Sequence, residues 1–348
     1  MLNRVYKFPN SNSPRTPTCY IRGRYLRRDA AQSRRPFITA MSANTSKSTK
    51  QPAEPRPSAS VVVVNERNEI LLVQRNPRAR HFGGVTVFPG GNYDAKQDPT
   101  LEITAIRETF EESGLLLAHS KKGASPSNAV LDEARHAIHS QKTAFNSFLQ
   151  EHLLEPDTSA LLPFTRWITP VGPPRRFRTQ FYVTFLPAAS ASGFSSGDKE
   201  ERLPKHDGGL EVISARFITP EAALAECNEG KITFMPPQFY IITTLASILR
   251  GAKNTAAQRA TVQQLSQGAF GQMVINPRRL KEPDSEGRAI LTYEGDETRG
   301  GSKGRLHRAL VRLDKAGILT HEIILQRNFD IFTEVEPQAF HTPGLPKL

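Results

Sequence analysis

GGNYDAKQDPTLEITAIRETFEESGL, residues 90–115, is the stretch that decides the fold of this 348-residue chain. Its second half predicts a helix with one strongly acidic face. Three carboxylates recur at i, i+3 and i+4 and therefore point the same way: Glu108, Glu111 and Glu112. Like charges at this spacing repel, and Arg107 can pair with Glu111 but cannot neutralise three acids. A divalent metal with oxygen ligands would supply the missing charge, although a solvated acidic helix face has the same pattern.

The residues on either side of this helix predict a tight turn before it and caps at both ends. Gly90 and Gly91 follow a short β-like run, and glycines there allow a sharp turn and a close approach of a ligand to the backbone. Asp98 or Thr100 can cap the start of the helix, and Gly114 can end it. The stretch therefore predicts a strand, a glycine turn and a capped helix, in that order.

The residues RETFEESGL, 107–115, resemble the core of the Nudix box, and Gly91 resembles its leading glycine. Three features depart from the usual box. The spacing from Gly91 to Arg107 is two residues longer, Pro99 stands where an earlier glutamate would align, and Thr109 replaces an aliphatic residue. The resemblance implies an α/β fold, namely an α/β/α sandwich around a mixed β-sheet, with a helical insertion after the box helix and a C-terminal extension.

Membership of this family would assign roles to the acidic residues. The resemblance implies that Glu108, Glu111 and Glu112 bind Mg²⁺ or Mn²⁺ and that Arg107 orients them by pairing. Many Nudix enzymes use one more acid outside the box as ligand or base, and Glu211 is our candidate. The implied chemistry is hydrolysis of a diphosphate linked to another group, with a metal-bound water as nucleophile.

The residues before the box carry a second resemblance. The segment LLVQRNPRARHFGGVTVFPGG, which starts at Leu71, is similar to the signature that precedes the box in coenzyme A diphosphatases. Four residues are the candidate substrate contacts: Arg75, Arg80, Gly90 and Gly91. Arginine donates bidentate hydrogen bonds to phosphate, although ordinary surface charge beside a turn would look the same.

Later segments narrow the resemblance to one branch. RWITP and RFRTQFYVTFLP, within residues 166–187, resemble the peroxisomal, Nudix motif 19 type of these enzymes. The implied substrate is coenzyme A or acyl-coenzyme A, and the products are adenosine 3′,5′-bisphosphate and (acyl-)phosphopantetheine. Arg175, Arg176 and Arg178 can attract an acidic ligand or be simply solvated.

Two alternatives stay open. The first is a Nudix hydrolase of another nucleoside diphosphate, such as NADH or ADP-ribose, although the SQPWPFP-type element of NADH diphosphatases is absent from the sequence. The second is a non-catalytic Nudix binding or regulatory module, which the altered loop and Pro99 would explain.

Three segments are predicted: a basic targeting segment and linker at 1–57, a Nudix domain at 58–250, and a C-terminal extension at 251–348. The insertion within the Nudix domain spans about 120–158, and residues 131–154 are predicted to be helical, with their apolar residues on roughly one face. Its histidines are expected to face solvent: His136, His139 and His152. The C-terminal extension either adds a strand layer to the domain or binds a partner.

Charge and composition exclude several classes of protein. Residues 1–60 hold twelve Lys and Arg against two acids, so they carry +10 of the net charge of +12 and leave +2 for the remainder. A nucleic-acid partner is therefore not expected, because the body lacks a basic surface. No apolar run is long enough for a membrane span, and two distant cysteines make no disulfide framework. The sequence does not predict an oligomeric state.

Both ends of the sequence carry possible targeting signals. Residues 1–40 are rich in Arg and Ser and poor in acids, which predicts a mitochondrial presequence or a disordered basic tail. Met41 is a second plausible start. The last three residues, Pro-Lys-Leu at 346–348, resemble the peroxisomal signal Ser-Lys-Leu. Initiation at Met41 would remove the presequence and leave the peroxisomal address.

Overall fold

The computed structural model of the chain describes residues 53–78, 83–121, 126–173, 175–186, 212–314 and 319–335. The chain divides into two units at residue 51, and every described residue lies in the second, Pro52–Leu348. The predicted targeting segments at both ends fall outside the described residues, apart from residues 53–57. Within the described ranges, no helix combines the length and the apolar character that crossing a bilayer requires.

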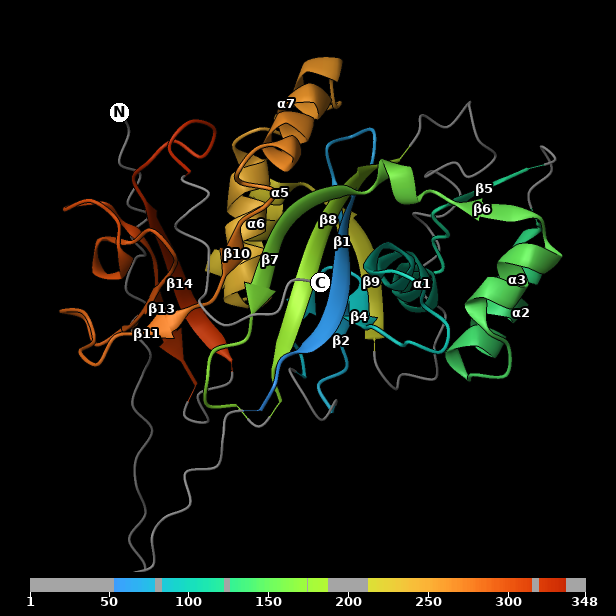
Figure 1. Ribbon diagram of the computed structural model, residues 1–348, viewed down its shortest axis with the longest axis horizontal. Coiled ribbons are helices and arrows are strands. Elements are labelled where there is room, and N and C mark those ends of the chain that lie inside the picture. The colour runs from blue at the N-terminus through green and yellow to red at the C-terminus, as the bar shows by residue number, and fades with distance from the viewer. Residues whose placement is uncertain are drawn as a thin grey trace, which may run out of the picture. The chain divides into compact units, whose positions relative to one another are not determined.

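A mixed eight-stranded sheet forms the centre of the second unit (Figure 1). Its order is β10-β7-β8-β1-β2-β3, with β4 paired to β1 and β9 paired to β2. β1 runs parallel to β8 and antiparallel to β2 and β4, and β10 runs parallel to β7. The strands are β1 Arg56–Val64, β2 Ile70–Arg75, β3 Thr86–Val87, β4 Gly90–Asn92, β7 Leu162–Ile168, β8 Phe177–Phe185, β9 Val212–Ile218 and β10 Val274–Ile275.

Both faces of this sheet are buried, which explains the run of four valines in β1. Val61 and Val63 belong to one hydrophobic core, and Val62 and Val64 belong to the other. Side chains alternate between faces along a strand, so a strand covered on both sides is apolar throughout. Burying one such side chain contributes roughly 1.5–3 kcal/mol. The predicted α/β/α sandwich is therefore confirmed.

Different helices cover the two faces of the sheet. On one face lie helix α1, Leu101–Ser113, and the insertion that follows it. On the other face lie α5 Pro220–Asn228, α6 Pro236–Ala246 and α7 Ala256–Gln267 (Figure 1). Thr219 and Thr255 cap α5 and α7 with their hydroxyl groups.

The segment predicted to be a helical insertion contains two helices. α2 spans Asn128–His139 and α3 spans Phe145–Glu151, and Gln141 between them has φ 58°. A residue in this left-handed conformation ends a helix. Two short strands, β5 Ala118–Ser120 and β6 Leu154–Pro156, pair antiparallel and frame the helices.

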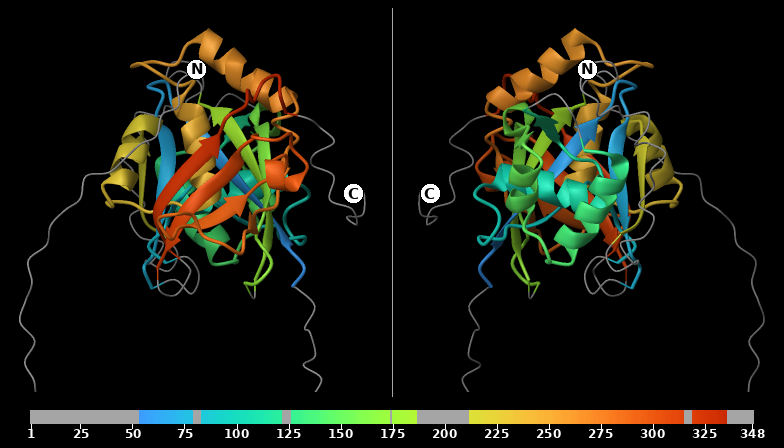
Figure 2. Two further views of the ribbon diagram at one scale, coloured as in Figure 1. Left: turned by 90° about the vertical axis from the view of Figure 1, so that its left-hand side faces the viewer. Right: turned by 90° about the vertical axis from the view of Figure 1, so that its right-hand side faces the viewer.

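The residues after 250 share the core of the sheet. β10 extends the main sheet beside β7, and four strands form a second, antiparallel sheet, which faces the viewer in the left panel of Figure 2. Trp167 of β7 packs edge-on against Tyr240 of α6 and against Tyr293, at ring-centroid distances of 5.4 and 5.2 Å. Of the two alternatives for this segment, the structure shows the added strand layer. Its strands are β11 Arg278–Arg279, β12 Ala289–Thr292, β13 His307–Leu313 and β14 Thr320–Arg327.

The contact between α1 and the insertion yields a prediction. Phe110 of α1 is fully buried, and its ring stacks on Phe148 of α3 at 5.8 Å. We expect Phe110→Ala to lower the free energy of unfolding by about 3–5 kcal/mol, because it leaves a cavity between these helices. The matched control is Phe332→Ala, at a side chain that is 42% exposed, where a change within about 0.5 kcal/mol is expected. Urea denaturation measures both, and equal losses would contradict the proposed packing role.

Candidate functional site

Helix α1 is fixed at both ends. Of the two predicted caps, Thr100 occupies the N-cap position, and its hydroxyl oxygen accepts from the backbone N–H of Ile103 at 3.4 Å. Gly114 has φ 75°, and its N–H donates to the carbonyl of Phe110 at 2.9 Å. Arg135 of α2 donates to the carbonyls of the last turn, at residues 111 and 112, over 2.8 and 3.0 Å. A cation at this end complements the helix dipole.

Arg107 is the centre of the site. Only 4% of the residue is exposed, and its Nε and Nη2 donate to the two carboxylate oxygens of Asp98, both at 2.8 Å. Its Nη1 donates to Oε1 of Glu111 at 2.9 Å and lies 2.9 Å from Oε1 of Glu108. A further bond from Nη2 reaches the carbonyl of Asn92 at 3.1 Å. The predicted pairing of Arg107 with Glu111 is confirmed.

These contacts shift the pKa values of the groups involved. Burial by itself lowers the pKa of Arg107, but the bond to Asp98 and the charges of Glu108 and Glu111 raise it above its ordinary value. Burial by itself raises the pKa of Glu111, but hydrogen bonds from His139 and Arg107 outweigh it and lower the pKa. Both groups are therefore charged at neutral pH.

Both glycines before the helix lie where a side chain would clash, and Gly91 makes room for a carboxylate of α1. A Cβ atom on Gly91 would lie 2.3 Å from the carboxyl carbon of Glu108, a distance that real Cβ atoms do not adopt. A Cβ on Gly90 would lie 2.4 Å from the carbonyl oxygen of Ala59. The backbone N–H of Gly90 donates to Oε2 of Glu112 at 3.0 Å. The predicted close approach to the backbone is thus made by the carboxylates of α1.

Asp98, which the sequence predicts only as a possible helix cap, belongs to the site. It is 1% exposed, and its Oδ2 also accepts from the N–H of Asp94 and the hydroxyl of Thr104, each at 3.0 Å. It places a carboxylate one residue before Pro99, where the usual box glutamate would align. An acid next to the position of the missing box glutamate was the one sequence feature that could have indicated this role.

The expectation that His139 faces solvent is wrong. Its Nδ1 lies 3.5 Å from Oε2 of Glu111, because α2 ends beside α1. The carboxylate of Glu111 is therefore held on one oxygen by Arg107 and on the other by His139. The neighbouring His136 is exposed, as expected.

Three of the predicted site residues lie outside the box helix and its glycine turn. Arg80 and Glu211 lie outside the described residues. Arg75 ends β2, where its N–H donates to the carbonyl of Val85 and its own carbonyl accepts from Gly84. The Nε of Arg75 is buried, and no described group hydrogen-bonds to it. Phosphate contact by these arginines stays a prediction.

The acidic face of α1 has the donor atoms of a metal site. Glu108, Glu111 and Glu112 offer hard carboxylate oxygens, the ligands that Mg²⁺ and Mn²⁺ prefer. The side chains of Glu108 and Glu111 are 14% and 12% exposed, and Glu112 is buried. Across the described ranges, no three His, Cys, Asp or Glu side chains already converge on one point. The donor set fits a divalent cation in its chemistry, and its oxygens are held by Arg107 and Gly90 in this structure.

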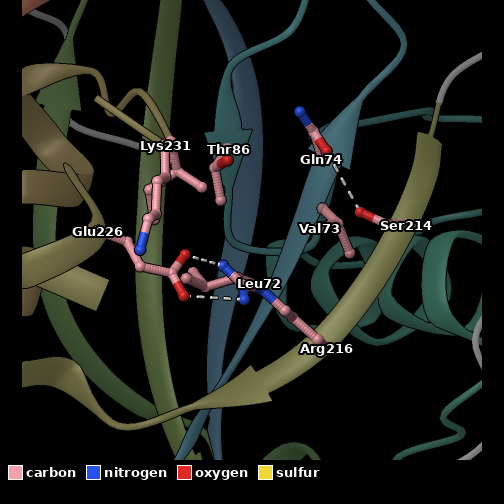
Figure 3. Close-up of a pocket in the computed structure, with 9 residues that line it drawn as sticks. Leu72, Val73, Gln74, Thr86, Ser214, Arg216, Glu226 and Lys231 are labelled. Atoms are coloured by element: carbon pink, nitrogen blue, oxygen red, sulfur yellow. Dashed lines mark hydrogen bonds and ion pairs between the residues drawn. The ribbon is translucent and has the colours of Figure 1, made fainter. Parts of the chain in front are cut away.

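A separate hollow of about 290 Å³ lies between β2, β3, β9 and the end of α5 (Figure 3). In it Arg216 pairs with Glu226, and Ser214 donates to Gln74 at 3.5 Å. None of the predicted site residues lines this hollow, so it is distinct from the acidic face of α1. Its lining residues are Leu72, Val73, Gln74, Thr86, Ser214, Arg216, Glu226, Lys231 and Ile232.

Comparisons with known proteins agree with these features. Residues 54–133 match the model of the NUDIX domain, and residues 96–245 match that of the NUDT19 Nudix domain. The Caenorhabditis elegans protein named "Putative nudix hydrolase 7" is 27% identical over 201 residues, which cover 56% of this chain and 61% of that protein. The Xenopus laevis protein named acyl-coenzyme A diphosphatase NUDT19 is 32% identical over 238 residues, covering 51% and 59%. Its Gallus gallus namesake is 25% identical over 268 residues, covering 68% and 64%.

The chain spans about three fifths of the length of these relatives. The family models confirm the resemblance to the Nudix family that the box residues predicted. The names of two relatives confirm that the resemblance extends to the coenzyme A diphosphatase-like branch.

The buried pair of Asp98 and Arg107 yields a prediction. We expect Asp98→Ala to lower the free energy of unfolding by about 3–5 kcal/mol, because it leaves a buried guanidinium without its bidentate partner. The control is Glu133→Ala, at an exposed acid of α2, which should change stability by about 0.5 kcal/mol or less. Thermal and urea unfolding give both values. A loss at Asp98 no larger than the control's would show that the pair does not anchor the loop.

Proposed function

We propose that this chain is a metal-dependent Nudix hydrolase that cleaves the diphosphate linkage of coenzyme A or acyl-coenzyme A. The products would be adenosine 3′,5′-bisphosphate and (acyl-)phosphopantetheine. The observation that supports this proposal best is the acidic face of α1, where Arg107 and the Gly90-Gly91 turn hold three carboxylates. The names of the curated relatives support the choice of substrate.

Glu108, Glu111 and Glu112 would hold the divalent cation. When bound, such a cation neutralises charge on phosphate oxygens and lowers the pKa of a coordinated water. The protein's own part is orientation. Arg107 fixes Glu108 and Glu111, and the N–H of Gly90 fixes Glu112, so the carboxylates are positioned before substrate arrives.

The alternative of a non-catalytic module loses its main support. It depended on Pro99, which replaces a glutamate of the usual box. Asp98 supplies a buried carboxylate to Arg107 from the adjacent position, so the altered loop keeps an acidic partner for the arginine. Hydrolysis of another nucleoside diphosphate is a further alternative, and a substrate panel separates it from the proposal.

The central prediction concerns Glu111. We expect Glu111→Gln to reduce the release of adenosine 3′,5′-bisphosphate from coenzyme A at least about a hundredfold, because it removes a charged ligand of the cation. Chelation by EDTA should abolish the activity, and Mg²⁺ or Mn²⁺ should restore it. The matched control, Glu133→Gln on the exposed face of α2, should retain full activity.

The outcome of the same assay on other substrates decides between the alternatives. Turnover of NADH or ADP-ribose but not coenzyme A would overturn the proposed substrate and keep the hydrolase. Binding of these nucleotides without turnover of any of them would overturn the hydrolase and favour a binding module.

For localisation, we propose two destinations, the mitochondrion through the Arg- and Ser-rich segment before Met41 and the peroxisome through Pro-Lys-Leu at 346–348. Both segments lie outside the described residues. We expect a form that starts at Met1 to enter mitochondria and a form that starts at Met41 to enter peroxisomes. Imaging of tagged forms with a free C-terminus measures this, and identical distributions would refute it.

A further inference from the structure

A straight row of residues crosses the sheet from the candidate active site to an arginine. Gly91 of β4 is paired with Ala59 of β1, Ala59 with Gln180 of β8, and Gln180 with Arg166 of β7. Directly paired residues point to the same face of a sheet. Gly91 lies beneath Glu108, and Ala59 packs in the core on the α1 side. Arg166 is therefore on the same face as α1, about 14 Å from Gly91 along the row, at three strand spacings.

A second arginine lies beside the first. Arg178 is two residues before Gln180 on β8, so its side chain is on the same face. Its paired residue is Ile168, two positions from Arg166, which makes Arg166 and Arg178 diagonal neighbours. The Nε of Arg166 donates to Oε1 of Gln180 at 3.1 Å.

Neither arginine has an acidic partner among the described residues. Among the described residues, the side chain of Arg166 hydrogen-bonds only to Gln180, and the side chain of Arg178 makes no hydrogen bond. Glu102, at the start of α1, is on this face but accepts from the hydroxyl of Tyr182 at 2.8 Å. Burial lowers the pKa of Arg166, and the positive charge of Arg178 lowers it further. Two half-buried cations thus repel each other with no anion to offset them.

The two other arginines of the neighbouring basic turn, Arg175 and Arg176, are not available in the same way. Arg176 is buried and donates to the carbonyls of Thr169 and Ala53 at 2.9 and 3.0 Å, which is a structural role. Arg175 is exposed. Of the basic residues in this turn, only Arg178 is on the face of the acidic helix with its guanidinium uncommitted.

We propose that Arg166 and Arg178 bind a second phosphate of the substrate, separate from the diphosphate that is cleaved at α1. Two guanidinium groups suit a phosphomonoester, because each can donate two parallel hydrogen bonds to its oxygens. This inference rests on the proposed function and refines its substrate class to nucleoside diphosphate derivatives that carry an additional phosphomonoester. The 3′-phosphate of coenzyme A is such a group.

The test compares coenzyme A with dephospho-coenzyme A, which lacks that phosphate. The wild-type chain should prefer coenzyme A in kcat/KM. Arg166→Gln and Arg178→Gln should each reduce this preference about tenfold, mainly through KM, since a charge-assisted hydrogen bond is lost. Arg178→Lys should retain part of it. The control, Arg175→Gln, should leave the preference unchanged. Equal losses on both substrates, or none, would overturn the proposal.

A binding measurement separates this inference from the proposed hydrolysis. Calorimetry with adenosine 3′,5′-bisphosphate and with AMP reports the contribution of the 3′-phosphate without turnover. We expect the bisphosphate to bind about tenfold or more tightly to the wild-type chain, and Arg178→Gln to remove the difference. If hydrolysis fails but this difference is found, the proposed function falls and the phosphate site stands. If the two nucleotides bind wild type equally, the phosphate site falls.

Discussion

One buried guanidinium organises the candidate active site. Arg107 cannot be left unpaired in the interior, because an isolated buried charge costs several kcal/mol. Its Nε and both Nη atoms are used, and they join two carboxylates of α1 to Asp98 of the preceding loop. The same contacts that stabilise the loop therefore hold Glu108 and Glu111 in place. Stability and orientation of the acidic face depend on a single side chain.

The parts of the site that follow from helical spacing could be predicted from the sequence. The common face of the three glutamates and the pairing of Arg107 with Glu111 both need only a regular helix. Asp98 was missed because its partner is nine residues away across a loop, and an acid before a helix has a more common role as its cap. Gly91 was predicted to be a close-approach glycine, but the identity of the approaching group, Glu108, depends on how α1 packs on the sheet.

Details of the insertion and of the C-terminal layer could not be predicted from local sequence patterns. The apolar pattern over 131–154 continues through the break at Gln141 because both α2 and α3 bury residues in the same core, as Leu131 and Phe148 do. The contact of His139 with Glu111 arises from the crossing of two helices, which no local pattern encodes. In β13, Arg308 and Arg312 alternate with buried Ala309 and Val311. This alternation has the period of two that indicates a strand, but it extends over only a few residues.

The central sheet separates the candidate site from the elements that pack on its opposite face. β1 is paired with β8 along its whole length, and a slip by one residue would exchange the valines between the two cores. This register fixes which residues share a face with α1. The helices α5, α6 and α7 and the second sheet belong to the core on the opposite face. These elements enlarge the core on that face and so stabilise the sheet. The row from Gly91 to Arg166 is on the other face, with the acidic helix. Because the row is set by backbone pairing, residues that are distant in sequence, such as Gly91 and Arg166, keep a fixed spacing.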